Sequence, residues 1–141
     1  MNKPFLLFAV KCSVILYFAA CTSIDHLTIT KSATPVICKG LCKLELCTST
    51  PEKNCEACNL EYYHFAFDQN GELKASNNGR VIKGSWSEDN ISKQIHISFD
   101  NAGPVFSELN NYWTIENIEN AQVSLNSSGG ETTCRLKITS L

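Results

Sequence analysis

The chain has 141 residues, of which 43% are apolar and 18% are charged, and its 12 lysines and arginines nearly balance 14 aspartates and glutamates. This length fits one domain. A net charge of −2 without a basic run argues against a nucleic-acid binder, which would carry clustered lysine and arginine. Eight cysteines in so short a chain indicate either disulfides formed in an oxidising compartment or a metal site.

The first residues predict a secretory signal peptide over residues 1–20. Lys3 precedes an apolar stretch, and the apolar run from Cys12 to Ala20 is interrupted only by Ser13. This nine-residue run is too short to cross a bilayer as a helix, which needs roughly 20 apolar residues. A positive start followed by a short apolar core is instead typical of secretion.

The end of that run, Phe18-Ala19-Ala20-Cys21, resembles a bacterial lipobox, in which an apolar residue and two small residues precede the lipidated cysteine. The resemblance implies that residues 1–20 are removed and that Cys21 is acylated, with chains such as palmitate holding the protein on a membrane. Residues 21–35, which are rich in serine and threonine, are predicted to form a tether. The alternative is ordinary secretion with cleavage after Ala20, which would leave Cys21 a plain thiol.

The predicted location is the bacterial cell envelope. Thr22 and Ser23, which follow Cys21, do not include the aspartate that signals inner-membrane retention in enteric bacteria. Their absence of charge favours the outer membrane, on its periplasmic or its surface face. The expected partner is therefore the membrane itself, through the lipid anchor, and no nucleic acid is expected.

A cysteine-rich segment over residues 36–60 follows the tether. Removal of Cys12 with the signal and use of Cys21 for the lipid leave six cysteines: Cys38, Cys42, Cys47, Cys55, Cys58 and Cys134. An even number in an exported protein predicts three disulfides, whose 15 possible connectivities the sequence does not distinguish. If all six are oxidised, at least one bridge reaches Cys134 and ties this segment to the last strand. The alternative is a zinc site at Cys55 and Cys58, whose spacing matches a zinc knuckle but which lack a second matching pair.

Residues 61–141 alternate between apolar and polar side chains with a period of two, which is typical of strands. Turns are expected at residues 68–71 and 77–79, where asparagine and glycine supply positive φ, and residues 105–111 form either a strand end or one helical turn. The side chains predicted to face inward include Phe65, Phe67, Ile82, Trp86, Ile91, Ile95, Ile97, Phe99, Trp113, Ile115, Val123, Leu125, Cys134, Leu136 and Ile138. About seven short strands without a long helix predict an all-β fold, an antiparallel meander that closes into a small barrel.

Several motifs in this region resemble the lipocalin-like domain of small bacterial lipoproteins. They are Tyr63-His64-Phe65-Ala66-Phe67, Gly84-Ser85-Trp86-Ser87, Phe106-Ser107-Glu108-Leu109-Asn110, Trp113 and Ser128-Gly129-Gly130. The resemblance covers residues 61–141 and implies a small β-barrel on a bacterial envelope, but it supplies no ligand. In lipocalins the Gly-x-Trp motif lies on the first strand, whereas here it comes later, and the cysteines at 38–58 are outside the shared pattern.

The residues that commonly carry catalysis fall into no recognisable site. His26 lies in the predicted tether, while His64 and His96 have the polar parity of their strands, which predicts solvated side chains. Glu108 and Glu116 are separated by a turn and part of a strand, without the paired environment that distinguishes a general acid from a base. We therefore expect no enzymatic activity, cofactor or metal.

Trp86 and Trp113 are the candidate ligand-binding residues. Because both have core parity, they either pack within the barrel or line an apolar pocket at its mouth, where lipocalin-like folds bind small hydrophobic molecules. The leading hypothesis is a non-catalytic module that binds a small apolar ligand. The alternative is a structural or protein-interaction module of the bacterial surface, and an envelope enzyme is a third, less favoured hypothesis.

Overall fold

The structure is a computed structural model that describes residues 31–48, 60–100, 103–127 and 133–141. Two short helices and eight strands follow one another along these residues. In chain order they are α1 (Thr34–Ile37), β1 (Leu41–Thr48), β2 (His64–Phe67), β3 (Glu72–Asn77), β4 (Arg80–Asp89), β5 (Gln94–Ser98), α2 (Pro104–Ser107), β6 (Asn111–Ile118), β7 (Gln122–Ser127) and β8 (Cys134–Ser140).

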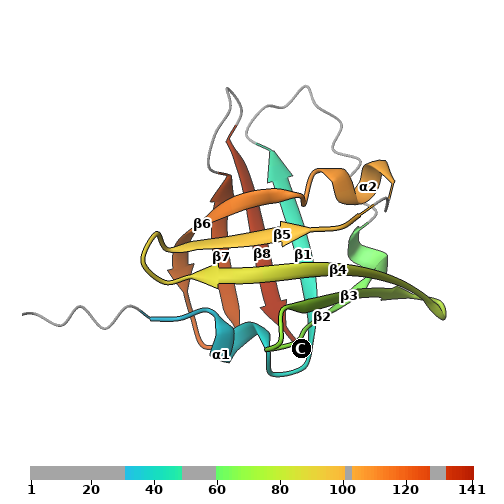
Figure 1. Ribbon diagram of the computed structural model, residues 1–141, viewed down its shortest axis with the longest axis horizontal. Coiled ribbons are helices and arrows are strands. Elements are labelled where there is room, and N and C mark those ends of the chain that lie inside the picture. Colours follow the sequence, from blue (N-terminus) through green and yellow to red (C-terminus); the bar gives the residue numbers. More distant parts are fainter. Residues whose placement is uncertain (1–30, 49–59, 101–102, 128–132) are drawn as a thin grey trace, which may run out of the picture.

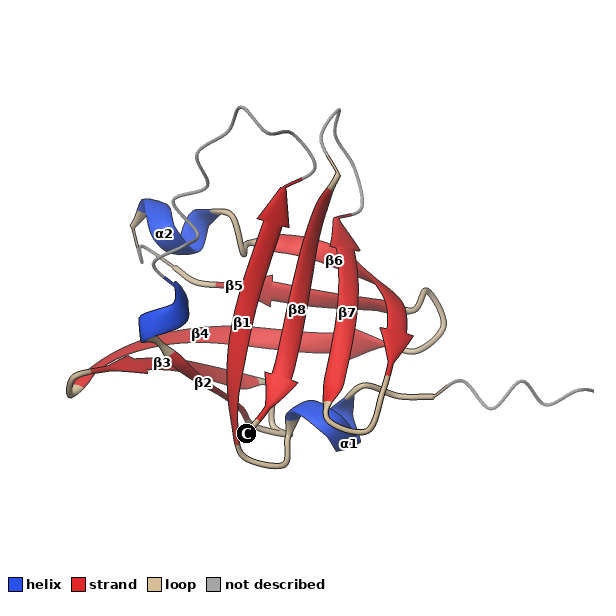
Figure 2. Ribbon diagram, turned by 180° about the vertical axis from the view of Figure 1, so that it is seen from behind, coloured by secondary structure: helices blue, strands red, loops and turns tan. Residues whose placement is uncertain are grey.

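The eight described strands form a closed antiparallel barrel in which each strand pairs with the next in the sequence. The barrel closes where β8 returns beside β1, as Figures 1 and 2 show. That ladder runs over seven positions, from Cys42 opposite Ser140 to Thr48 opposite Cys134. Closure removes the unpaired edges that an open sheet would expose. The predicted all-β meander that closes into a barrel is therefore confirmed.

Side chains from every strand fill the space inside the barrel. One buried residue from each strand illustrates the core: Leu44, Phe65, Leu73, Trp86, Ile97, Trp113, Leu125 and Leu136, none more than 6% exposed. Their neighbours two positions along each strand are mostly apolar as well, because alternate residues of a strand point to the same face. The period of two read from the sequence is thus the alternation between core and solvent.

β6 contains an irregularity at Glu116. The register with β7 shifts between Ile115 and Asn117, so that Ile115 lies opposite Leu125 and Ile118 lies opposite Val123. Because a bulge inserts one extra residue in the strand, the side chain three positions after Ile115, that of Ile118, points inward again. Ile115 and Ile118 consequently both pack against the core.

β1 lies inside the segment that the sequence predicts to be cysteine-rich and irregular. Cys42, Leu44 and Leu46 face the core, while Lys43 and Glu45 face solvent. This is an ordinary strand pattern, which the density of cysteines obscured. The β domain therefore begins before residue 61, since β1 is one of the strands that close the barrel.

Two local predictions are wrong. Ile91, expected to face inward, is 97% exposed because it lies in the β4–β5 turn. The Asp89 carboxylate accepts hydrogen bonds from the Ile91 and Ser92 backbone N–H groups and the Ser92 hydroxyl, and Lys93 has a positive φ. The strand expected from residue 61 begins instead at His64, after a helical turn at residues 60–62.

The two helices cover parts of the core that the strands leave open. α1 packs against β7 and β8 at the end of the barrel where β1 begins (Figure 2). Val36 and Ile37 of α1 are buried there, as is Ala33 just before the helix. α2 is the helical turn anticipated within residues 105–111, and its Phe106 packs against Tyr63 and Phe99. The final residues of the predicted tether, 31–35, are thus part of the folded unit.

Candidate functional site

The two candidate ligand-binding tryptophans are both buried, on strands that flank β5. Trp86 lies opposite Ile97 and is 6% exposed, and Trp113 lies opposite Ile95 and is 1% exposed. The Trp86 indole N–H donates to the Asp68 carbonyl (2.8 Å), and the Trp113 indole N–H donates to the Leu109 carbonyl (3.0 Å). Each ring therefore has its one polar group satisfied by the protein itself.

The glycine of the Gly-x-Trp motif makes room for an aromatic neighbour. A Cβ atom at Gly84 would lie 2.5 Å from the Ser98 carbonyl oxygen and 2.7 Å from the Phe99 ring. The ring of Phe99 thus lies over the backbone of β4, a close approach that only glycine permits. The space beside Gly84 is therefore occupied by Phe99.

The Glu-Leu-Asn turn also has a structural role. The Phe99 backbone N–H donates to the Asn110 Oδ1 atom (2.6 Å), and the Asn110 Nδ2 atom donates to the Phe99 carbonyl (3.1 Å). The amide of Asn110 therefore joins the end of β5 to the start of β6 across α2. Leu109, next to it, is fully buried and supplies the carbonyl that binds Trp113.

Glu88 on β4 is a site residue that the sequence analysis missed. Its carboxylate accepts hydrogen bonds from the Ser32 hydroxyl (2.8 Å), the Ala33 backbone N–H (2.7 Å) and both the backbone N–H (3.0 Å) and hydroxyl of Thr34. Burial alone would raise its pKa, but these hydrogen bonds together hold the pKa below its ordinary value. We call this group of contacts the Glu88 latch, because it fixes α1 to the barrel.

A depression of about 380 Å³ lies beside Trp86, between the β2–β3 turn and the end of β4. Its lining is polar apart from the tryptophan: Thr34, Gln69, Asn70, Gly71, Ser87, Glu88 and Asn90. The Glu88 carboxylate in this lining is already bound to α1. Polar and apolar atoms contribute almost equally to the lining, so the depression lacks the predominantly apolar walls that are typical of a site for a small hydrophobic ligand.

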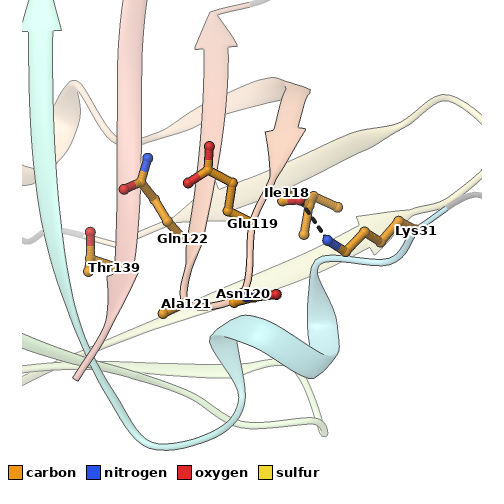
Figure 3. Close-up of a pocket in the computed structure, with 7 residues that line it drawn as sticks. All are labelled: Lys31, Ile118, Glu119, Asn120, Ala121, Gln122 and Thr139. Atoms are coloured by element: carbon orange, nitrogen blue, oxygen red, sulfur yellow. Dashed lines mark hydrogen bonds between the residues drawn. The ribbon is translucent and has the colours of Figure 1, made fainter.

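A second depression, of about 570 Å³, lies at the β6–β7 turn, with Lys31 at one side of it (Figure 3). The Lys31 ammonium donates to the Ile118 carbonyl (2.7 Å), so the start of the described chain is fixed to the turn. Its other lining residues are Glu119, Asn120, Ala121, Gln122 and Thr139. Polar and apolar atoms contribute almost equally to this surface as well.

The histidines in the described ranges lie on the outer face of the barrel. His64 is exposed, and His96 stacks on Tyr112 with ring centroids 4.3 Å apart. Glu108 and Glu116 are both exposed. Within the described ranges, no group of three histidines, cysteines or carboxylates is placed to hold a metal ion. His26 and the proposed zinc pair Cys55 and Cys58 lie outside the described residues.

Four of the six predicted disulfide cysteines lie in the described residues, and none is bonded there. Cys42 is buried, Cys38 and Cys134 are partly buried and Cys47 is exposed. Because Cys55 and Cys58 lie outside these ranges, the three predicted bridges stay a prediction. Cys21 and the predicted signal peptide are also outside them. No helix within the described ranges is long and apolar enough to cross a membrane.

Comparison with known proteins supports the fold. No protein-family model matches the chain, and no curated protein matches it. A solved structure of a DUF4847 family protein from Bacteroides vulgatus ATCC 8482 is similar, with a TM-score of 0.54 and 15% sequence identity. The match covers 77% of this chain and 96% of the other. At this identity the likeness shows that the two chains share a fold.

Proposed function

We propose that this protein is a lipid-anchored, non-catalytic module of the bacterial cell envelope that contacts a partner protein through the outer face of its barrel. The observation that carries the proposal is the burial of Trp86 and Trp113, each with its indole N–H bound to a backbone carbonyl. A ligand stacked on either ring would have to displace these packed side chains. The interior therefore favours the surface-interaction hypothesis over an apolar ligand held inside the barrel.

The outer face of β4, β5 and β6 offers the aromatic surface that such a contact needs. Ser87, His96 and Tyr112 form one row across the three strands, and Tyr112 is 57% exposed. Exposed aromatic side chains are enriched at protein interfaces, because they bury a large area and retain a polar tip. Neither His96, which lies on this face, nor His64, which lies on β2, lines a depression described above, and this supports a non-catalytic role.

Crosslinking on intact cells tests the surface contact. A photo-reactive amino acid at Tyr112 of the full chain should give a discrete protein adduct, whereas the same residue at Lys43, an exposed position on β1, should give none. Native mass spectrometry of the purified chain tests the ligand-binding alternative. A stoichiometric small apolar molecule bound to the protein, without an adduct at Tyr112, would favour the ligand-binding alternative.

The lipid anchor has its own test. The lipobox Phe18-Ala19-Ala20-Cys21 motivates the expectation that the mature chain begins at an acylated Cys21 and fractionates with the envelope membranes. Cys21→Ser should move the protein to the soluble fraction or leave its signal uncleaved. A mature N-terminus at Cys21 without acyl mass would contradict the anchor but not the proposed surface contact.

A further inference from the structure

The four described cysteines lie at two opposite ends of the barrel. Cys38 and Cys42 flank the turn between α1 and β1, while Cys47 and Cys134 lie where β1 ends and β8 begins. Figure 2 shows α1 at one end of β1 and the start of β8 beside the other. Six residues of ladder separate the Cys42 rung from the Cys134 rung, which corresponds to about 20 Å along the strands.

This geometry limits which cysteines can bond to one another. A disulfide requires Cα atoms within about 7 Å, so neither Cys47 nor Cys134 reaches Cys42 in this fold. Cys47 and Cys134 are close in the ladder, but Cys47 has the outward parity of Glu45 and Cys134 the inward parity of Leu136. Side chains that point to opposite faces of a sheet do not form a disulfide without moving the backbone.

Cys38 and Cys42, by contrast, meet at one turn. The Cys42 thiol donates to the Ile37 carbonyl (3.3 Å), and that carbonyl group is joined directly to the Cys38 nitrogen. The intervening residues are Lys39, Gly40 and Leu41, and the glycine gives this short loop conformational freedom. The Cys42 sulfur is therefore held only a few bond lengths from the Cys38 backbone.

We propose that Cys38 and Cys42 form a disulfide that fixes α1 to the start of β1. A small disulfide such as oxidised glutathione serves as the oxidant. The Cys38 thiolate attacks one glutathione sulfur and releases one glutathione thiolate, giving a mixed disulfide. The Cys42 thiol loses its proton to water, and its thiolate then attacks the Cys38 sulfur and releases the second glutathione thiolate. The protein loses two electrons and two protons, and one glutathione disulfide becomes two thiols.

The raised pKa values of the two thiols predict that thiol–disulfide exchange with glutathione is slow. Burial, and then the negative charges of Asp68 and Glu88, raise the pKa of Cys38. Burial and the neighbouring Cys38 raise the pKa of Cys42 to about 11. Little of either thiol is ionised at neutral pH, so the exchange must be allowed to reach equilibrium before it is analysed.

Peptide mapping of the full chain tests this pairing directly. Trypsin cleaves after Lys31, Lys39 and Lys43, which places Cys38 in peptide 32–39 and Cys42 in peptide 40–43. The protein is equilibrated with oxidised glutathione, its remaining thiols are alkylated under denaturing conditions, and it is digested without reduction. We expect these two peptides to be linked and to separate when a reductant is added. The wild-type map decides the question without relying on a variant.

Matched variants show the specificity of the link. Cys38→Ser should leave Cys42 alkylated, and Cys42→Ser should leave Cys38 alkylated, whereas Cys47→Ser should leave the link between the two peptides intact. The proposal is overturned if both cysteines are alkylated after equilibration in the wild-type chain. It is also overturned if either is linked to a peptide that carries Cys47, Cys55, Cys58 or Cys134.

Discussion

At the scale of single residues, the motifs that suggested a ligand site are explained by packing. A glycine is required at position 84 because the Phe99 ring and the Ser98 carbonyl occupy the space that a side chain would need. The parity of Trp86 and Trp113 was readable from the sequence, and both face the core as that parity predicts. The hydrogen-bond partners of the two indole N–H groups could not be predicted, because they are backbone carbonyls and the pattern of side chains does not indicate where such carbonyls lie.

Replacement of Gly84 by alanine should destabilise the protein by about 1–3 kcal/mol, because the new Cβ atom would force β4 away from Phe99. Urea unfolding followed by tryptophan fluorescence measures the loss. Gly40→Ala is the matched control, since a Cβ atom there would meet no atom within 4 Å. Equal stability of the two variants would contradict the close approach at Gly84.

At the scale of elements, the most consequential contact is the Glu88 latch. A helix of four residues is too short to persist on its own, so α1 depends on what it contacts. The Glu88 carboxylate satisfies the N–H groups of Ala33 and Thr34, and Pro35 has no N–H to satisfy. The serine, threonine and proline at 32–35 are typical of a helix start, but the carboxylate that binds them lies more than 50 residues away in the sequence.

Glu88→Gln should lower the free energy of unfolding by about 1–3 kcal/mol at neutral pH, because charge-assisted hydrogen bonds are lost. The pKa of Glu88 is depressed in the folded protein, so its contribution is complete above the ordinary value of 4.5 and is lost as the pH falls through the depressed pKa. Urea unfolding at neutral pH and at several values below 4.5 measures this difference.

The wild type and Glu88→Gln should converge in stability as the pH falls. Glu116→Gln is the control, because Glu116 is exposed and does not contact α1 in the described structure. A difference between wild type and Glu88→Gln that persisted unchanged at acid pH would show that the ionised carboxylate is not what fixes α1.

At the scale of the whole molecule, the class of fold was predictable and its closure was predictable only in part. Strand alternation from residue 61 onward indicated a meander, and a meander of this kind closes to protect its edges. The strand that completes the barrel, β1, was not predicted. Its cysteines were interpreted as disulfide partners, and the alternation of core and solvent residues among them was overlooked. The bulge in β6 was hidden for another reason: an extra residue shifts the alternation without any change in composition.

Closure predicts that β8 is as well protected as the strands before it. In hydrogen exchange followed by mass spectrometry, amides in residues 134–140 should exchange as slowly as those in β3 and β4, because β8 pairs with β1 over seven positions and with β7 over five. The β4–β5 turn at residues 90–93 should exchange rapidly and serves as the internal reference. Fast exchange of β8 would indicate an open sheet in which β8 is an edge strand.

The chain enters and leaves the barrel at one end. Lys31 and α1 lie there, and the backbone N–H of Leu141 donates to the Leu41 carbonyl at the same end (Figure 1). Tension applied through residue 31 would act on the Glu88 latch and on Lys31 before it reached any strand. α1 could therefore detach under load while the barrel stayed closed, so the latch sets the mechanical strength of this attachment separately from the stability of the fold.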